Sequence, residues 1–350
     1  MDLYLKIATQ IQKFIKDDLI FIPSEMEGKI LRVEVPIPAL EPLSWLERQK
    51  SDIKTYWCDR QGDFTMAGVG ILDEIAGDIP IDYPTIFGRL RQNLSPLFPQ
   101  VRYYGGIGFS QDRSIDPNWK FFGNYRFIVP RFELWTDGIN TFFACNFRAS
   151  GDNFDSDLDS VPKRIRQPEL DSILTQLTKL DFTPSEIGSI PLQIDRVDLP
   201  NRDDWQRNID LALAKFTDLA LEKIVLARQS TLTFAADLQP QSLLRSLKPN
   251  NPHSYHFCFQ INPHIAFIGT SPERLYYRQD RLLKTEAIAG TRQRGESATI
   301  DRQLSDNLRK SPKDLHEHQL VVNNLQTILN ELCDSVTIDR ELTILKLNKV

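Results

Sequence analysis

The chain has 350 residues, of which 41% are hydrophobic and 25% are charged, as expected for a soluble globular protein with a sizeable core. Its net charge is −5 with acids and bases interspersed, and no basic run or basic-aromatic stripe indicates a nucleic-acid surface. The four cysteines are far apart and form no zinc-binding pattern, so we interpret them as reduced thiols: Cys58, Cys145, Cys258 and Cys333.

The first 22 residues predict an amphipathic helix. Apolar residues recur at helical spacing from Leu3 to Ile15, and lysines and glutamines interrupt them. The segment has neither the apolar core of an export signal nor the length to span a bilayer. We therefore expect no membrane association and a cytoplasmic location.

Alternation and aromatic residues predict β-strands through the next 130 residues, with a helix at 83–94. The strands are expected at 29–36, as short strands and turns within 40–83, and in three aromatic-rich runs at 101–110, 121–134 and 141–149. We expect the three aromatic-rich runs to pair as antiparallel strands of one sheet.

The segment 181–202 is the best linker, because Pro184, Pro191 and Pro200 punctuate it. A polar loop at 150–166 and a helix at 167–180 precede this linker. We therefore expect the chain to divide near residue 200 into an N-terminal part, 1–200, and a C-terminal part, 201–350. Beyond the linker we expect helices at 203–221, 241–247 and 300–309, strands at 223–234, 254–262, 265–270 and 335–347, and a hairpin at 274–287.

A long helix is predicted to begin after Ser311 and to run to about Leu332. Serine is a good N-cap, Pro312 suits the first helical position, and Asp314 stands where the acid of a capping box would stand. Its buried stripe is expected to include Val321.

Two residues could move protons. Lys223 opens a predicted strand, and if that face is covered, its ammonium would give up a proton readily and act as a general base; otherwise it is a strand-end lysine that reaches solvent. Glu273 follows Ser271-Pro272 beside an apolar run and could be a general acid. The alternative is a turn glutamate paired with Arg274 or Arg292.

Glu317 lies in the first turns of the long helix, on the side of its apolar stripe. A carboxylate that faces inward needs a partner, and a hard divalent cation is one candidate. The alternative is an acid that favours the helix macrodipole without further function, and this alternative is stronger for Asp314.

The loop 287–291 ends in Gly290 and Thr291, whose backbone N–H groups and hydroxyl could approach an anion closely. The alternative is a plain turn. Arg292 is a further candidate for reaching the substrate.

Four segments, in this order, resemble the chorismate-utilising enzymes: EKIVLAR at 222–228, FIGTSPERL at 267–275, TEAIAGTRQRG at 285–295 and SPKDLHEHQLVV at 311–322. Lys223 and Glu273 are 50 residues apart (273 − 223), and Glu273 and Glu317 are 44 apart (317 − 273), which fits the same family. The resemblance is strong after about residue 200 and weaker before it. It implies an α+β fold with two facing antiparallel β-sheets and helices packed outside.

The resemblance also implies roles for the candidate residues. Lys223 would activate water to attack C2 of chorismate, and Glu273 would protonate the departing C4 hydroxyl. Glu317 would hold Mg²⁺ against a substrate carboxylate. Gly290 and Thr291 would contact the substrate.

Lys223 together with Ala289 matches the members of the family that use water rather than ammonia. The implied activity is that of an isochorismate synthase that depends on Mg²⁺ and serves menaquinone, phylloquinone or salicylate/siderophore synthesis. The alternatives are a salicylate synthase, which makes isochorismate and then eliminates pyruvate, and a non-catalytic chorismate-binding relic. A monomer without a glutaminase subunit is expected.

Family members continue past the position of Val350, so the resemblance implies a chain that is incomplete at its C-terminus. The continuation would supply a second magnesium carboxylate, an arginine for the substrate and further strands. We therefore expect residues 1–350 alone to be inactive and prone to aggregate, because sheet edges and apolar surface would be exposed.

Overall fold

The computed structural model describes residues 3–15, 26–78, 82–109, 117–149, 167–183, 188–217, 221, 223–339 and 341–350. The predicted loop at 150–166 lies outside these residues. The chain divides into two compact units. Unit 1 comprises Met1–Gly188, Pro240–Lys248 and Ser254–Ser271, and unit 2 comprises Ser189–Gln239, Pro249–His253 and Pro272–Val350. The chain thus returns to unit 1 twice after residue 200.

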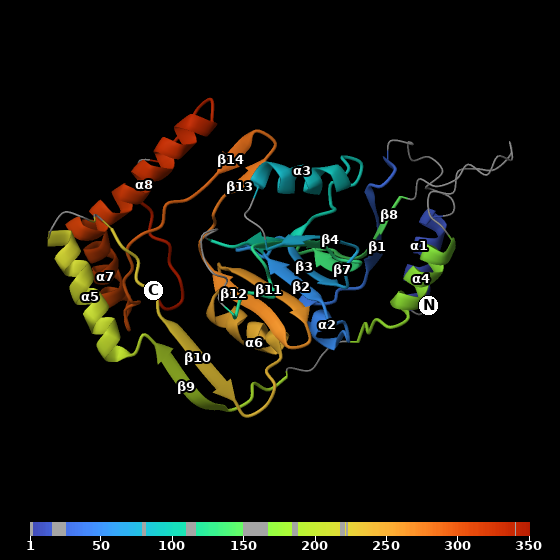
Figure 1. Cartoon of the computed structure of the whole chain (residues 1–350), viewed down its shortest axis with the longest axis horizontal. Helices are drawn as coiled ribbons and strands as arrows, with labels where there is room; N and C mark the ends of the chain where they lie inside the picture. Colours follow the sequence, from blue (N-terminus) through green and yellow to red (C-terminus); the bar gives the residue numbers. More distant parts are fainter. Residues whose placement is uncertain are drawn as a thin grey trace. The chain divides into compact units, whose positions relative to one another are not determined.

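Unit 1 is built on a seven-stranded antiparallel sheet with the order β1-β8-β7-β3-β2-β11-β12 (Figure 1). Its strands are β1 Ile30–Ile37, β2 Lys54–Cys58, β3 Thr65–Val69, β7 Phe132–Thr136, β8 Thr141–Arg148, β11 Tyr255–Asn262 and β12 Ile265–Ser271. The pairing of β11 with β2 joins residues about 200 positions apart, with Cys258 opposite Tyr56. This long-range pairing is what assigns 254–271 to unit 1.

Four helices pack against this sheet or against one another beside it: α1 Leu3–Lys13, α2 Pro42–Arg48, α4 Gln167–Leu177 and α6 Pro240–Leu247. The shared core is rich in large side chains, and Trp45 and Phe143 are both fully buried with their rings edge to face. Burial of such aromatic side chains contributes most of the stability of a core of this kind.

A charged cluster lies inside the same unit. Arg32 donates to Glu133 at 2.9 Å and to Asn146 at 3.2 Å, and the Asn146 amide donates to Glu133 at 2.8 Å. All three residues are buried. Buried charges are tolerated where each has partners, as here.

A second sheet of unit 1 has three strands in the order β4-β6-β5, namely β4 Asp73–Gly77, β6 Tyr125–Val129 and β5 Tyr104–Ile107. Helix α3 (Tyr83–Asn93) supplies Ile86 and Leu90 to its apolar cluster. The expectation that the three aromatic-rich runs share one sheet is therefore wrong. The run 121–134 divides at Pro130, which has no N–H to donate to a ladder, into β6 of one sheet and β7 of the other.

The described residues of unit 2 form two small two-stranded sheets and three helices. Strands β9 (Gln193–Leu199) and β10 (Gln229–Phe234) form one two-stranded sheet, and β13 (Tyr277–Gln279) and β14 (Leu282–Lys284) form the other. The helices are α5 Arg202–Thr217, α7 Ala298–Lys310 and α8 Pro312–Leu332. The predicted α+β class is confirmed, and all described strand pairs of both units are antiparallel.

Three expectations about segments differ from the structure. Residues 223–228 are irregular and only 229–234 form a strand, because the partner β9 ends at Leu199, opposite Gln229. No strand occurs in the described residues of 335–347. Helix α2 was missed, although Glu41 caps it and Pro42 begins it.

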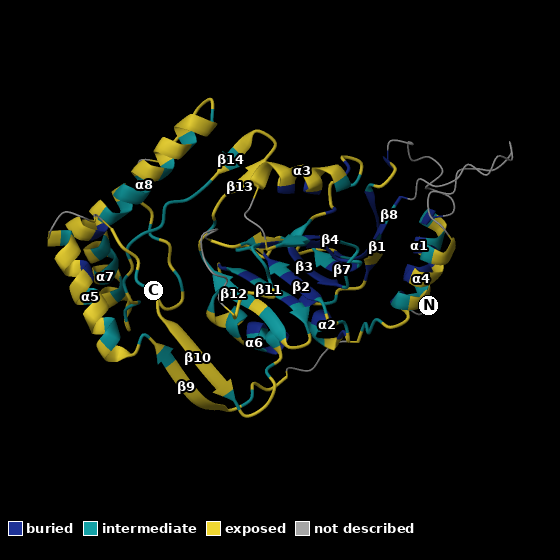
Figure 2. Cartoon of the chain, in the orientation of Figure 1, coloured by how far each residue is buried: buried dark blue, intermediate teal, exposed yellow. Residues whose placement is uncertain are grey.

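Burial differs sharply between the units (Figure 2). Among the described residues of unit 2, only Ala212 and Asp314 are buried. The expected buried stripe of α8 is half-buried at Val321 and exposed at Leu332. Ion pairs and hydrogen bonds therefore contribute much of the contact between the described segments of this unit.

All four cysteines are free thiols, and burial raises the pKa of both Cys145 and Cys258 to about 12. Across the part of the chain that the structure describes, no helix has the length and apolarity to cross a membrane.

Candidate active site

The five residues Lys223, Glu273, Gly290, Thr291 and Glu317 all lie in unit 2. Glu317 belongs to α8, and the first turns of this helix contact Lys223 and Gly290. Ser311 caps this helix, because its hydroxyl accepts from the Asp314 N–H at 3.4 Å, and Pro312 occupies the first turn. The predicted start is confirmed. The Asp314 carboxylate accepts from Arg292 at 2.6 Å, an interaction that the capping-box prediction did not include.

Lys223 and Glu317 form an ion pair, with 2.9 Å between Nζ and Oε1. The two residues are 94 positions apart in the sequence, so the fold of unit 2 brings them together. Their side chains are 33% and 37% exposed. Lys223 is therefore less covered than the prediction of a desolvated base required, because its segment belongs to no sheet that could cover it.

The loop 287–291 is fastened to α8. His318 Nε2 lies 3.1 Å from the carbonyl oxygen of Ala287, within hydrogen-bond distance. Gly290 has a φ of +77°, in the left-handed region that favours glycine. A Cβ at this position would lie 3.1 Å from Leu308 Cδ1 and 3.2 Å from Asp314 Cβ, so a larger residue would also crowd both helices.

Arg292, the residue after this loop, makes hydrogen bonds through all three of its side-chain nitrogens. It donates through Nη2 to Asp314 at 2.6 Å, through Nε to Asn307 at 3.1 Å, and through Nη1 to the carbonyl oxygen of Thr291 at 2.9 Å. The hydrogen bond from Arg292 holds the pKa of Asp314 below its usual value. These contacts give Arg292 an internal role, and its contact with the substrate stays a prediction.

Glu273 is exposed in the irregular segment that follows β12. Its neighbour Arg274 pairs with Glu286 at 2.7 Å, and the hydroxyl of Thr285 donates to the carbonyl oxygen of Leu275 at 2.7 Å. These contacts close the base of the hairpin that leads from Glu273 to the loop. The general-acid role of Glu273 stays a prediction, and the residue is more exposed than the sequence led us to expect.

The described residues contain no group of three or more His, Cys, Asp or Glu side chains that could hold a metal ion. Glu317 nevertheless fits Mg²⁺ as a single ligand. Its carboxylate is an accessible oxygen donor that already holds a cation, the Lys223 ammonium. Mg²⁺ is commonly bound through one or two carboxylates, with water and substrate oxygens completing its shell.

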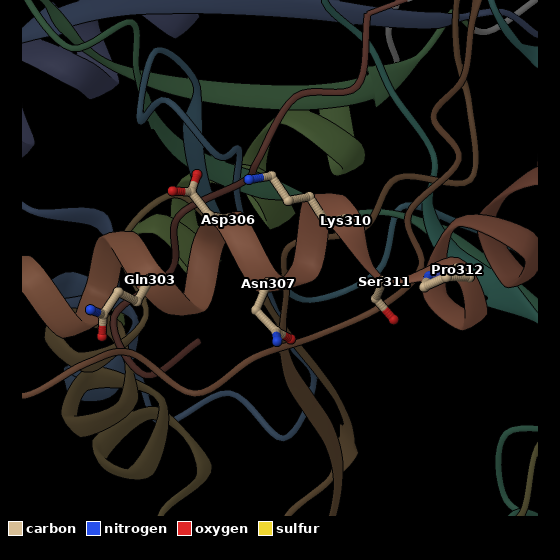
Figure 3. A pocket seen from close by; sticks show the side chains of 6 residues that line it. All are labelled: Gln303, Asp306, Asn307, Lys310, Ser311 and Pro312. Atoms are coloured by element: carbon tan, nitrogen blue, oxygen red, sulfur yellow. The ribbon is translucent and has the colours of Figure 1, made fainter.

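An open depression lies at the junction of α7 and α8 (Figure 3). Its lining residues are Gln303, Asp306, Asn307, Lys310, Ser311 and Pro312. None of the five predicted site residues is among them. It meets the loop contacts only through Asn307, which also accepts from Arg292.

Sequence reasoning missed the contacts of Asp314, Arg292, Asn307 and His318 that attach the loop to the two helices. The sequence did indicate that Asp314 could lie near the predicted site. Asp314 is three residues before Glu317 and so projects from nearly the same side of the helix.

The Lys223–Glu317 ion pair and the loop 287–291 are both attached to the first turns of α8, within an α+β fold. The sequence profile described as "Chorismate binding enzyme" matches residues 15–350, and the chain belongs to this family.

Individual relatives support the assignment. The chain is 28% identical over 369 residues to the chloroplastic isochorismate synthase of Catharanthus roseus, covering 94% of this chain and 62% of that protein. It is 29% identical over 313 residues to the isochorismate synthase MenF of Escherichia coli (strain K12), covering 88% and 64%. The chain thus spans less than two thirds of the length of these relatives.

The fold is similar to the solved structure of MenF, the menaquinone-specific isochorismate synthase from Escherichia coli. The TM-score is 0.76 at 23% identity, and the match covers 98% of this chain and 73% of that one.

Proposed function

We propose that the chain acts as an isochorismate synthase that adds water at C2 of chorismate and releases the C4 hydroxyl. The observation that carries the proposal is the contact of Lys223 with Glu317 across 94 residues, beside the Gly290 loop. The relatives named isochorismate synthase support the choice of reaction.

In the proposed reaction, Lys223 takes a proton from water as the water oxygen bonds to C2. The ring double bonds shift, the C4–O bond breaks, and Glu273 gives its proton to the departing oxygen, so that a second water leaves. Substrate and product have the same atomic composition, because one water is gained and one is lost. Gly290 and Thr291 would hold the substrate through backbone N–H groups and the hydroxyl.

Glu317 would be the protein ligand of Mg²⁺, and the bound ion would supply Lewis-acid charge for a substrate carboxylate. For this to occur, Lys223 must leave the Glu317 carboxylate, which frees the same amine to reach a water. A product used for menaquinone synthesis agrees with the description of the MenF structure as menaquinone-specific, and phylloquinone synthesis is the alternative that we propose beside it. We further infer a cytoplasmic monomer that needs no glutaminase subunit.

The test is incubation of the protein in its longest available form with chorismate and Mg²⁺, followed by chromatographic separation of the products. Residues 1–350 alone are assayed in parallel, and we expect them to be inactive. Isochorismate without pyruvate is expected from the longest form. Salicylate with pyruvate would replace the proposal with a salicylate synthase. Chorismate binding measured by calorimetry, with no turnover, would indicate a binding protein instead.

Two variants with a matched control assign the roles. Lys223→Ala and Glu273→Gln should each lower kcat by about 100-fold or more, as is typical when a general base or acid is removed. Lys346→Ala removes another lysine of unit 2, an exposed one whose Nζ lies 4.0 Å from Asp301 Oδ2, and should leave kcat unchanged. Full activity of Lys223→Ala would contradict the mechanism.

A further inference from the structure

The Asp314 carboxylate is one of two buried groups among the described residues of unit 2, with 9% of the residue exposed. A buried carboxylate is stable only with partners that compensate for lost water. Its partner is the guanidinium of Arg292, which also reaches Asn307 on α7. One side chain from the end of the loop therefore ties both helices together.

Three separate contacts fasten the loop to α8, and each arises from a different kind of interaction. The ion pair of Arg292 with Asp314 supplies charge, Gly290 packs against the Asp314 side chain, and Ala287 is bridged to His318. Asp314 takes part in two of the three. Because Glu317 lies one turn further along the same helix, the loop and Glu317 are held as one body.

We propose that Asp314 is a positioning residue for the substrate: through Arg292 it holds the Gly290–Thr291 loop at a fixed place beside Glu317. This rests on the proposed function, which assigns the loop to substrate and Glu317 to the cation. Asp314 itself touches neither. The hydrogen bond from Arg292 lowers the pKa of Asp314 below its usual value, which agrees with an ionised carboxylate paired to the guanidinium.

The loop would contact the substrate both in the initial complex and in the transition state. A looser loop therefore weakens the binding of both states equally, which raises KM and leaves kcat nearly unchanged. Asp314→Asn should therefore raise KM about tenfold and change kcat less than about threefold. A merely structural role would have a different signature: a smaller folded fraction lowers the apparent kcat and leaves KM unchanged.

Asp301→Asn is the matched control. It removes the other aspartate–arginine pair near the loop, in which Asp301 accepts from Arg294 at 2.6 Å, by the same chemical change. Asp301 lies on α7 and does not contact Gly290 in the way that Asp314 does. KM should be unchanged in this variant. Asn307→Ala, which removes only one acceptor of Arg292, should raise KM by a smaller factor and guards against a failure of Asp314→Asn to fold.

Hydrogen–deuterium exchange gives a readout that needs no turnover. Peptides that cover 285–294 should exchange faster in Asp314→Asn than in the wild type or in Asp301→Asn. Exchange at the wild-type rate would overturn the proposal, and so would faster exchange with an unchanged KM. Lack of chorismate conversion by the wild-type protein in its longest available form would refute the proposed function, whereas the exchange experiment would still decide whether Asp314 holds the loop.

Discussion

Replacing Lys223 with methionine tests whether its ammonium occupies the cation position at Glu317. Methionine keeps the length of the side chain and removes the charge, so Glu317 loses its 2.9 Å partner. A divalent cation that binds wild-type protein must displace the ammonium, whereas in the variant it need not. Cation affinity should therefore rise in Lys223→Met.

The exposure of the Lys223 and Glu317 side chains sets the size of the expected increase in cation affinity. About a third of each side chain meets solvent, which screens the pair and limits its worth to about 0.2–1 kcal/mol. The dissociation constant for the cation should fall by a factor of about 1.4 to 5, since about 1.4 kcal/mol corresponds to a tenfold change.

Electron paramagnetic resonance of Mn²⁺, used in place of Mg²⁺, measures this affinity without substrate or turnover. Lys346→Met is the control, because this lysine lies near Asp301 rather than Glu317 and should leave the affinity unchanged. Glu317→Gln should abolish binding. Equal or weaker Mn²⁺ binding by Lys223→Met would refute the reasoning, since it would show that the ammonium does not compete with the cation.

Three further predictions concern stability. Glu133→Ala leaves Arg32 buried without its carboxylate and should lower the free energy of unfolding of unit 1 by about 3–5 kcal/mol in urea titrations. Phe143→Ala empties a fully buried ring position and should lower it by a similar ~3–5 kcal/mol. The hydrogen bond from Arg294 lowers the pKa of Asp301 from 3.8 to about 2. The ionised Asp301 therefore stabilises the folded state above about pH 4, and this stabilisation is lost as the pH falls toward 2. The difference in Tm between wild type and Asp301→Asn should shrink over that pH range.

Controls for these variants are available in the same chain. Glu74→Ala removes the partly exposed Arg126 pair and should change stability by less than about 1 kcal/mol, and Ile139→Ala, at an 88% exposed position, should be nearly neutral. Of the five tryptophans only Trp205 lies outside unit 1, so tryptophan fluorescence reports chiefly on unit 1. Equal losses in Glu74→Ala and Glu133→Ala would contradict the burial argument. A Tm difference for Asp301→Asn that is constant from pH 5 to pH 2 would contradict the assigned cause.

Local signals explain the parts of the fold that the sequence predicted well. Ser311-Pro312 marks a helix start that depends only on neighbouring residues, and the structure has it there. The hairpin turn is also local: it lies at Asp280 and Arg281, and Asp280 adopts a positive φ of 51°, which aspartate tolerates better than most residues. Such features are set within four or five residues and need no knowledge of the rest of the chain.

The errors arise where distant residues decide the outcome. Whether 223–228 continues a strand depends on where β9 ends, and that end lies more than twenty residues earlier. Similarly, periodicity cannot show that the run 121–134 changes sheets at Pro130, because the partners of β6 and β7 lie in other parts of the sequence. Among the site residues, Lys223 and Glu317 were linked by family resemblance, since nothing local relates residues 94 positions apart.

Burial is the property that separates the two units, and it bears on how the site works. In unit 1 the apolar core positions side chains, whereas in the described part of unit 2 the loop and Glu317 are placed by ion pairs and hydrogen bonds. Exposed pairs weaken as salt screens them over about 10 Å or less, but the Asp314 carboxylate, with 11% of its side chain exposed, is shielded from that screening. The loop should therefore remain attached to α8 under conditions that release Lys223 from Glu317. That difference allows the amine to move while the groups that would bind the substrate stay in place.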